Sequence, residues 1–418
     1  MTTRDSGRRV VITGMGAITP LGLSPEEFWQ GCVEGRSGVT PITAFDASAY
    51  PVRINAAVKG FDPLDYIDRK EARRMARFTQ FAVASARQAI DAARLQLDKE
   101  DTSRIGVVLG NGNGGFPNTE EAGRTLVEKG GMRMDPFFVP KMLPNMAASQ
   151  VAIQFGLGGF NNTAITACAA STQAIGDALE VIRRGKAEVM LTGGTEAGIC
   201  EMGLASFCVM RALSTHNEEP EKASRPFDAE RDGFVCAEGA AILVLESLEH
   251  AKARGATILA ELAGCASSAD AYHIVAPCEN GEGALRAMRW ALEDAGITTD
   301  DVDYINAHGT STVLNDLAET RAIKGLFGER AYKIPISSTK SMIGHVLGGA
   351  GALESVVCVK TLQTGVIHPT INYEHPDPEC DLDYVPNKCR KADVRIILKN
   401  SFGFGGQNAC LVFKRFEE

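Results

Sequence analysis

Residues 163–185, TAITACAASTQAIGDALEVIRRG, contain the strand, loop and helix pattern from which the fold is deduced. A strand-like run, Ala164–Ala167, stops at Cys168, and small residues follow it. Apolar residues then recur at spacings of four and three, which predicts an amphipathic helix with one buried face: Ile175, Leu179 and Ile182. Cys168 therefore stands at the last step before a helix begins.

Two interpretations of Cys168 are open. Free cysteine is among the most buried residue types, so a packed structural thiol is the commoner outcome. A helix N-terminus, however, carries unpaired backbone N–H groups and a partial positive charge, which favour thiolate over thiol. Position alone makes Cys168 a candidate nucleophile, and the rest of the chain has to decide between the two interpretations.

Strand-like and helical runs alternate on both sides of this stretch. The clearest are RRVVITGMG (8–16), FTQFAVASARQAIDAARLQL (78–97), RIGVVLGNGNGG (104–115) and AEVMLTGGTE (187–196). Such alternation predicts an α/β fold with parallel or mixed sheets covered by helices.

A faint internal duplication links the two halves of the chain. The helix end and strand of residues 92–115 reappear in residues 286–312, and the stretch 163–185 is matched by residues 335–365, PISSTKSMIGHVLGGAGALESVVCVKTLQTG. Both of the latter stretches have a strand, a small-residue loop and an amphipathic helix, closed by Gly185 or Gly365. A duplicated α/β unit would bring two similar loops to one central site.

Composition limits the function classes. The chain has 418 residues, 44% hydrophobic, and a net charge of -9, which argues against a general nucleic-acid binder. It has no apolar run of about 18 residues, so we expect no membrane span. The N-terminus, MTTRDSGRRVVITG, lacks the apolar core of a signal peptide. Eleven scattered cysteines without CxxC spacing predict reduced thiols in a cytoplasmic protein, with no metal site.

One stretch departs from the acidic balance. Residues 68–77, DRKEARRMAR, carry five basic and two acidic side chains. They form either a solvated helix face or a docking patch for an acidic partner.

Two of the seven histidines lie in loops typical of active sites. His308, in INAHGTSTVLND, follows a strand, and His345, in SSTKSMIGHVLGGAGALE, lies in a glycine-rich loop before a helix. Lys340 precedes His345 by five residues, and Glu319 lies in the helix after His308. A Lys–Glu pair there would hold the imidazoles and set their protonation state.

A third loop, residues 400–408 (NSFGFGGQN), follows the predicted strand DVRIILK. Its glycines let the backbone approach a ligand closely. Phe402 or Phe404 beside them either packs against the body or acts as a movable lid.

Seven motifs occur in the order in which they are found in β-ketoacyl-acyl-carrier-protein synthases. They are TACAASTQAIG, RALST, ASRPFDAERDGFV, NAHGTST, STKSMIGH, GALE and NSFGFGG. The chain resembles these enzymes from VVITGMGAITPLG to NACLVFKRF, and it is most similar to the type II class of fatty-acid synthesis. One motif alone is modest support, but the ordered set is specific.

The resemblance implies a thiolase fold, a five-layer α-β-α-β-α sandwich of two duplicated halves, 1–256 and 257–418, in a homodimer. It also implies a decarboxylating condensation of an acyl thioester with malonyl-acyl-carrier protein in fatty-acid elongation. This chemistry calls for an acyl donor held on a low-pKa cysteine and for hydrogen-bond donors at an enolate oxygen, with no cofactor or metal.

The resemblance assigns the catalytic roles. Cys168 matches the nucleophile, and His308 and His345 match the pair that promotes malonyl decarboxylation and stabilises the enolate. Lys340 matches the family lysine, and Glu319 the acid that contacts it. The backbone N–H groups of Cys168 and Phe404 would form the oxyanion hole.

Further roles follow from the same resemblance. Thr310 and Thr312 match hydroxyls that bind the pantetheine arm, and Asp270 matches an acidic residue that moves with the Phe404 loop. Four basic residues match positions that dock the carrier protein, which favours the docking interpretation of the basic run: Lys70, Arg73, Arg74 and Arg211.

Three positions depart from the family pattern. Gln407 stands where Thr or His is common, Val313 where Pro is usual, and Asn113 where an apolar residue lines the acyl pocket. Because an alkyl chain offers a carboxamide no partner, we expect Asn113 to turn away and bond the glycine-rich backbone. The alternative is that it shortens the pocket, so chain-length preference stays open.

Other family members are weaker interpretations. A degradative thiolase lacks the TKSMIGH arrangement, and a type III-like condensing enzyme has Asn where His345 stands. A polyketide ketosynthase shares the Cys-His-His set and is the nearest rival. A non-catalytic subunit resembling a chain-length factor would have lost the nucleophile, and Cys168 is present.

Overall fold

The computed structural model describes residues 8–418, so residues 1–7 of the N-terminal segment compared above with signal peptides lie outside it. Within that range, ten strands form one mixed sheet in the order β10-β9-β13-β14-β8-β1-β7-β6-β4-β5. The first half of the chain supplies β1 (Val10–Ile18), β4 (Ile105–Gly110), β5 (Asn161–Ala164), β6 (Val189–Glu196) and β7 (Gly239–Ser247). The second half supplies β8 (Ala260–Ala269), β9 (Tyr304–Asn306), β10 (Ile336–Ser337), β13 (Ile396–Gly403) and β14 (Gln407–Lys414).

Each half of the sheet has the same topology. Numbered by position within its half, each runs 3-2-4-5-1, and the two first strands, β1 and β8, pair antiparallel at the seam. Pairing directions match as well: strands 3-2 and 2-4 are parallel, and strands 4-5 and 5-1 are antiparallel. The predicted duplication is therefore confirmed at the level of sheet topology.

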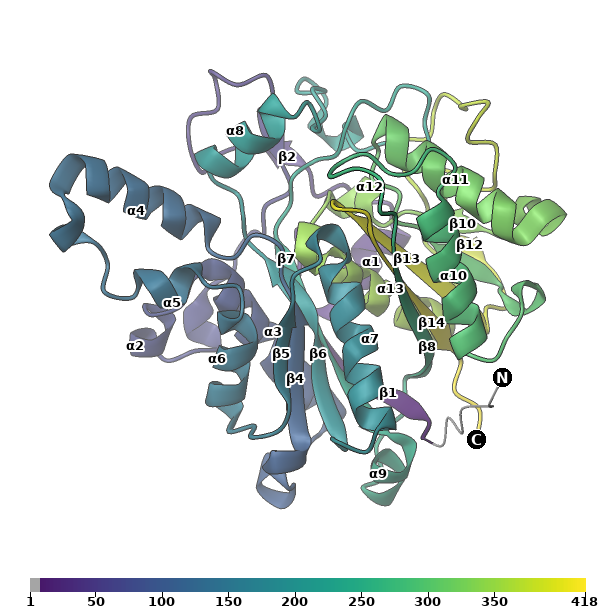
Figure 1. Cartoon of the computed structure of the whole chain (residues 1–418), viewed down its shortest axis with the longest axis horizontal. Coiled ribbons are helices and arrows are strands. Elements are labelled where there is room, and N and C mark those ends of the chain that lie inside the picture. The colour runs from purple at the N-terminus through teal and green to yellow at the C-terminus, as the bar shows by residue number, and fades with distance from the viewer. Residues whose placement is uncertain (1–7) are drawn as a thin grey trace.

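Helices complete five layers (Figure 1). Helices α3 (Arg77–Ala93) and α6 (Met146–Phe155) cover the outer face of the first half-sheet. Helices α10 (Glu282–Asp294) and α11 (Val313–Phe327) cover the outer face of the second. Helices α7 (Ala170–Arg183) and α13 (Ala350–Thr364) lie between the two half-sheets and contact strands of both. This arrangement confirms the predicted α-β-α-β-α sandwich.

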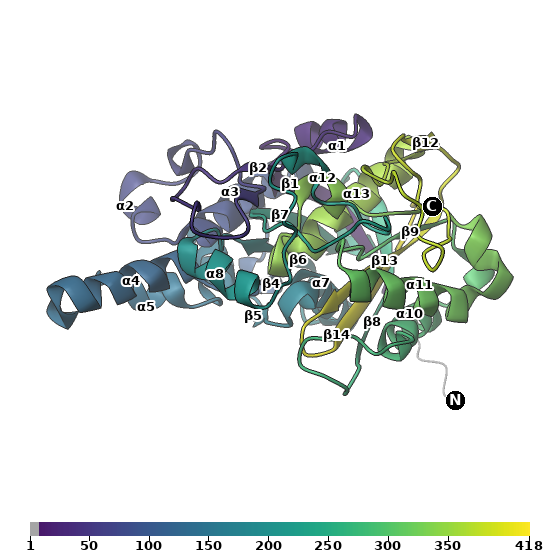
Figure 2. The same ribbon diagram turned by 90° about the horizontal axis from the view of Figure 1, so that it is seen from above.

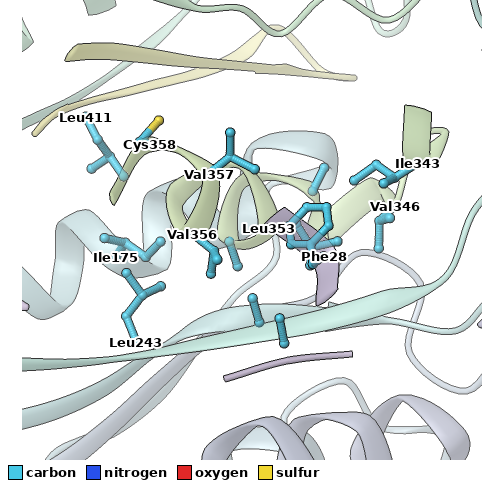
Figure 3. Packing of buried hydrophobic residues seen from close by; sticks show 14 of the residues in the cluster. Phe28, Ile175, Leu243, Ile343, Val346, Leu353, Val356, Val357, Cys358 and Leu411 are labelled. Atoms are coloured by element: carbon cyan, nitrogen blue, oxygen red, sulfur yellow. The ribbon is translucent and has the colours of Figure 1, made fainter. Parts of the chain in front are cut away.

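The largest hydrophobic cluster surrounds the central helix layer (Figure 3). It joins side chains from α7, α13 and both half-sheets, among them Ile175, Leu243, Leu353, Val356 and Leu411. All five are fully buried, and each such side chain stabilises the fold by about 1.5–3 kcal/mol. The packing fixes α7 against α13, so the loops that precede the two helices have fixed relative positions.

The backbone before α7 differs from the prediction in one respect. Strand β5 ends at Ala164, where its pairing with β4 ends, so the run Ala164–Ala167 is not a strand. Ala167 instead takes a positive φ of 49° and opens a short 3₁₀ turn, η5 (Ala167–Ala169). The predicted helix face is confirmed, since Ile175, Leu179 and Ile182 are all fully buried.

The loop before α13 repeats this geometry. Leu347 has a φ of 45° and opens the 3₁₀ turn η9 (Leu347–Gly349), so Gly348 occupies the position that corresponds to Cys168. Gly185 and Gly365 follow the two helices with φ of 67° and 64°, which confirms both as helix stops.

Several elements lie outside the layered body. Helices α4 (Phe116–Lys129) and α5 (Phe138–Met142), joined through the 3₁₀ turn η4 (Gly131–Arg133), project from it as an arm (Figure 1, Figure 2). The remaining elements are short: α1 (Pro25–Val33), α2 (Arg69–Ala72), α8 (Glu201–Val209), α9 (Leu248–Ala253), α12 (Lys340–Ile343), β2 (Thr40–Pro41), β3 (Ile54–Asn55), β11 (Val366–Ile367) and β12 (Arg390–Lys391). Among residues 8–418, no helix combines the length and apolarity needed to cross a membrane.

Candidate active site

The predicted catalytic loops line one cavity of about 680 Å³. Its lining includes Phe402 at the end of β13 and residues from the loops after β5, β9, β10 and β13: Cys168, His308, His345 and Phe404. Four loops from both halves of the chain therefore meet at one point, as the duplication predicts.

Cys168 lies in η5, directly before α7, and is 8% exposed. Burial raises the pKa of the Cys168 thiol to about 12, and Glu196 acts in the same direction. The charge of Lys340 and the backbone N–H groups of Phe404 and Cys168 lower this pKa by less. Burial therefore acts against the low pKa expected for Cys168 and favours the neutral thiol.

His345 is held as a neutral donor. Its Nδ1 accepts a hydrogen bond from the backbone N–H of Leu347 at 3.2 Å, so the ring proton belongs on Nε2. The Phe234 ring packs edge-on against it, with centroids 5.2 Å apart. Burial lowers the pKa of His345 well below its usual value, and the charges of Lys340 and Lys399 add to this effect.

His308 has the same protonation pattern. Its Nδ1 lies 3.3 Å from the Lys340 Nζ, whose N–H groups are donors only, so Nδ1 accepts and Nε2 carries the proton. The two imidazoles meet edge to face, with centroids 5.5 Å apart. Burial lowers the pKa of His308 well below its usual value, as do the nearby Lys340, His345 and Lys399.

The predicted contact between Lys340 and Glu319 is wrong. Lys340 Nζ donates to the His308 carbonyl oxygen at 2.6 Å and forms its ion pair with Glu354 on α13. Glu319, on α11, accepts the backbone N–H groups of His308 at 2.9 Å and Gly309 at 2.8 Å. Because α11 packs behind the His308 loop, Glu319 reaches only the backbone of that loop. Burial raises the pKa of Glu319 to about 7.

Three buried charged residues were missed from the sequence. They are Glu354 in GALE, Lys399 at the end of DVRIILK and Glu196 at the end of AEVMLTGGTE. Each of them interrupts an otherwise apolar or small-residue run, and this interruption is the sequence signal that could have indicated a buried charge. Glu196 accepts the backbone N–H groups of Gly112 at 2.8 Å and Gly348 at 3.1 Å, and burial raises its pKa to about 7.

The Phe404 loop is the hairpin turn between β13 and β14. Asp270 lies against it: its backbone N–H donates to the Gly406 carbonyl at 2.9 Å, and its Oδ1 accepts from Asn408 at 2.7 Å. Phe402 packs on the other side, with its ring centroid 5.7 Å from that of His308. The structure thus brings Asp270 and Phe404 together at the cavity.

Thr310 and Thr312 line the cavity next to His308, and their hydroxyl oxygens are 2.8 Å apart. The buried Asp316 accepts the backbone N–H of Thr310 at 3.0 Å and fixes this loop. Val313 lies half exposed at the same side of the cavity.

Asn113 does not bond the glycine-rich backbone through its side chain. Its neighbour Asn111 does so instead: Asn111 Nδ2 donates to the Thr195 carbonyl at 2.7 Å, and its Oδ1 accepts from Gly114 N–H at 2.7 Å. Asn113 lines the cavity, and only its backbone N–H is bonded, to Glu196 at 3.2 Å, among residues 8–418. The expectation for Asn113 is therefore wrong, because Asn111 already occupies the backbone partners.

The predicted docking residues lie outside the catalytic loops. Lys70 and Arg73 are exposed at α2, which spans only four residues. Arg74 is partly buried, 3.0 Å from Glu71 and stacked over Phe137. Arg211 is exposed and contributes to the cavity lining.

One group of metal-binding residue types occurs in the described part of the chain: Glu180, Cys265 and Asp294. The Arg183 guanidinium pairs with Glu180 at 3.1 Å and with Asp294 at 2.7 Å. The Arg183 side chain therefore already pairs with both carboxylates of this group, and the group lies apart from the cavity lining.

The arrangement suits covalent acyl chemistry. A buried thiol stands where two backbone N–H groups face its sulfur, and two neutral imidazoles present Nε2–H donors in the same cavity. Such donors stabilise an oxygen on which negative charge develops.

Two family models match the sequence over most of its length. "Beta-ketoacyl synthase, N-terminal domain" matches residues 7–251, and "Beta-ketoacyl synthase, C-terminal domain" matches residues 259–374.

Relatives and solved structures agree with these matches. The chain is 52% identical over 410 residues to 3-oxoacyl-(acyl-carrier-protein) synthase 2 of Synechocystis sp., covering 98% of this chain and 99% of the relative. Its fold is similar to that of the ishigamide ketosynthase/chain length factor, with a TM-score of 0.93, 37% identity and coverage of 98% and 100%. A type II PKS ketosynthase, solved with its acyl-carrier protein and bound to the hexaketide, has a TM-score of 0.88, 38% identity and the same coverage.

The protonation state of Cys168 is directly testable. With a pKa of about 12, the thiolate fraction rises about tenfold per pH unit, so iodoacetamide should alkylate Cys168 about tenfold faster per unit between pH 7 and 9. Peptide mass spectrometry measures the rate at this residue, with Cys168→Ala as the blank. A rate that levels off near pH 7 would show a thiolate in the resting enzyme.

Proposed function

The chain belongs to the β-ketoacyl synthase family, and we propose that it condenses an acyl group held on Cys168 with malonyl-acyl-carrier protein. The reaction releases CO₂ and gives 3-oxoacyl-acyl-carrier protein in fatty-acid elongation. The observation that carries the proposal is the meeting of one thiol and two neutral Nε2–H imidazoles in a single cavity.

The first step transfers the acyl group. Cys168 Sγ attacks the thioester carbonyl of the acyl carrier, and its proton ends on the departing pantetheine sulfur. The oxygen of the tetrahedral intermediate accepts hydrogen bonds from the N–H groups of Cys168 and Phe404, which face the sulfur. Thr310 and Thr312, beside the cavity, suit the pantetheine arm.

The second step forms the carbon–carbon bond. The malonyl thioester oxygen accepts from Nε2–H of His308 and His345 as CO₂ leaves and the electron pair moves onto the enolate. The enolate carbon attacks the acyl group on Cys168, the carbon–sulfur bond breaks, and the departing thiolate takes a proton from solvent. Lys340 is paired with Glu354, and its Nζ donates to the Nδ1 and to the carbonyl oxygen of His308. Glu319 holds the backbone of the same loop.

A fatty-acid role is better supported than a polyketide role. The curated relative at 52% identity is a 3-oxoacyl-(acyl-carrier-protein) synthase 2, whereas the type II PKS ketosynthase is 38% identical. Cys168 in the cavity argues against a non-catalytic subunit.

The acyl-carrier protein is the proposed partner. A neighbouring ketosynthase was solved with its acyl-carrier protein, which supports such a complex here. Lys70, Arg73 and Arg211 are exposed and would face acidic groups of the carrier. Arg74 contributes less, because Glu71 and Phe137 already hold its guanidinium.

We also propose a homodimer. Strand β5 is an edge of the sheet, and unpaired edges associate readily. Exposed apolar side chains gather on the segments around it and on the projecting arm, including Ile153, Phe160, Val127 and Met132.

Domain boundary and location complete the proposal. A boundary between residues 256 and 257 would lie in the loop between α9 and β8. All eleven cysteines are free, which supports a reducing, cytoplasmic environment.

The catalytic roles can be separated by substitution. His308→Ala and His345→Ala should each lower malonyl-carrier decarboxylation by about 10²–10³-fold, because each removes one enolate donor, while Cys168 is still acylated. CO₂ release and intact-protein mass spectrometry measure the two steps. Exposed His375→Ala is the matched control. Near-normal decarboxylation in both variants, or acyl label on another cysteine, would contradict the assignment.

Docking should depend on charge. A Lys70→Glu/Arg73→Glu/Arg211→Glu variant should raise the KM for carrier-bound substrate several-fold, since each exposed pair contributes about 0–1 kcal/mol. Activity toward acyl-CoA should change little, and added salt should reduce the difference. Reversal of Lys252 and Arg289, which are exposed elsewhere, is the control. An equal loss with both substrates would indicate a damaged fold instead.

The oligomeric state is measured by sedimentation. The 44.6 kDa chain should sediment at twice its mass, and Ile153→Glu/Phe160→Glu should shift it toward the monomer. Trp290→Glu, at an exposed position on α10 over the outer face of the second half-sheet, should leave the dimer intact. A monomeric unmodified protein at micromolar concentration rules the dimer out.

A further inference from the structure

We propose that Lys399 is a positioning residue, a second buried ammonium that shares Glu354 with Lys340 and keeps His308 and His345 as neutral hydrogen-bond donors. The inference rests on the proposed condensation, for which both imidazoles must present Nε2–H to the substrate. Lys399 lies on β13 and does not line the cavity, so it would act through the histidines.

The surroundings of Lys399 fit an ammonium group. The side chain is 0% exposed, and its Nζ donates to Thr172 Oγ1 at 2.6 Å and to the Ser401 hydroxyl. Its third neighbour is Glu354 Oε2 at 2.9 Å. These three oxygens surround the ammonium: the two hydroxyls accept hydrogen bonds from it, and the carboxylate oxygen lies at ion-pair distance without an aligned hydrogen bond. They come from the nucleophile helix α7, from α13 and from β13 itself.

Close helix packing makes room for this site. Gly351, at the start of α13, faces Thr172 on α7, and a Cβ there would clash with the Thr172 hydroxyl and lie 2.9 Å from Lys399 Nζ. The glycine thus lets α13 approach α7 closely enough for Glu354 and Thr172 to share one lysine.

The buried cluster carries an excess positive charge. Glu354 supplies one negative charge, and Lys340 and Lys399 supply two positive charges, all fully or almost fully buried. Breaking the balance of a buried pair in this way is costly for stability. Stabilisation of Glu354 alone therefore does not explain a second lysine. The charge of Lys399 also acts on the nearby imidazoles of His308 and His345.

The titratable groups near Lys399 come from every element packed on it. They are Glu354 and Cys358 on α13, Lys340 on α12, Cys410 on β14, and His308 with its backing Glu319 and His345 on the cavity side. Burial, then Lys340, then Lys399 all lower the pKa values of the two histidines. Burial lowers the pKa of Lys399 itself, and Glu354 opposes that change.

A neutral state matters because each Nδ1 is already committed. Protonation of His345 at Nδ1 would break its bond from Leu347 N–H, and protonation of His308 would place a proton against the Lys340 ammonium. The positive charges of Lys340 and Lys399 make protonation of either imidazole unfavourable at acidic pH. The negative charge of the developing enolate compensates the same excess of positive charge.

The test is the pH profile of malonyl-carrier decarboxylation between pH 4.5 and 8. Lys399→Met and Lys399→Gln remove the charge, so the acid limb should move upward by about half a unit or more. Thr172→Val is the matched control, because it removes one hydrogen bond from Lys399 and leaves the ammonium. Its acid limb should coincide with that of the unmodified enzyme, whatever its rate.

An NMR titration of the unmodified protein tests the proposal even if the Lys399 variants fail to fold. The protein is labelled with [2-¹³C]histidine, and the NMR signals of His308 and His345 are assigned with His→Asn variants. In the unmodified protein both signals should keep the chemical shift of a neutral imidazole from pH 8 to 6. In Lys399→Met the titration midpoints of both histidines should move to higher pH. Titration of both imidazoles near pH 6.5 in the unmodified protein overturns the proposal, as does an acid limb unchanged in both Lys399 variants. An unmodified enzyme that releases no CO₂ refutes the condensation instead, and the NMR titration then still decides the role of Lys399.

Discussion

The packing of α7 against α13 between two half-sheets is the constraint on which the active cavity depends. Each helix is preceded by a 3₁₀ turn opened by a residue with positive φ, Ala167 or Leu347. Such a backbone costs about 1–3 kcal/mol and persists only when its surroundings hold it. The shared hydrophobic core supplies that support (Figure 3). Cys168 and His345, on the loops before the two helices, line the same cavity.

Buried charge is the second organising feature. Lys340, Glu354 and Lys399 lie behind the imidazoles, and Glu196 and Glu319 hold the loops by accepting backbone N–H groups. Removing these groups from water is costly, so a core built only for stability would hold apolar residues of similar size. The fold accepts this cost close to the reacting atoms, where fixed charges and dipoles act without reorganisation.

The elements and the catalytic loops could be predicted from sequence, because periodicity and glycine position are local. The buried face of α7 and the stops at Gly185 and Gly365 are examples. What failed depended on tertiary distance or on burial. Glu319 and Glu354 are both acids on helices after catalytic loops, and only the packing of α11 and α13 shows which one reaches Lys340. Burial likewise raises the pKa of Cys168, an effect that spacing along the sequence cannot reveal.

The turn before α13 differs from the turn before α7 in one functionally important position. Gly348 occupies the position that corresponds to Cys168, yet a Cβ there would clash with the backbone nitrogen of Gly112. The second half therefore has no room at this turn for a side chain that corresponds to Cys168. Two copies of the first half would bring two Cys168 thiols to the cavity and neither His308 nor His345, so the two proposed steps need both halves.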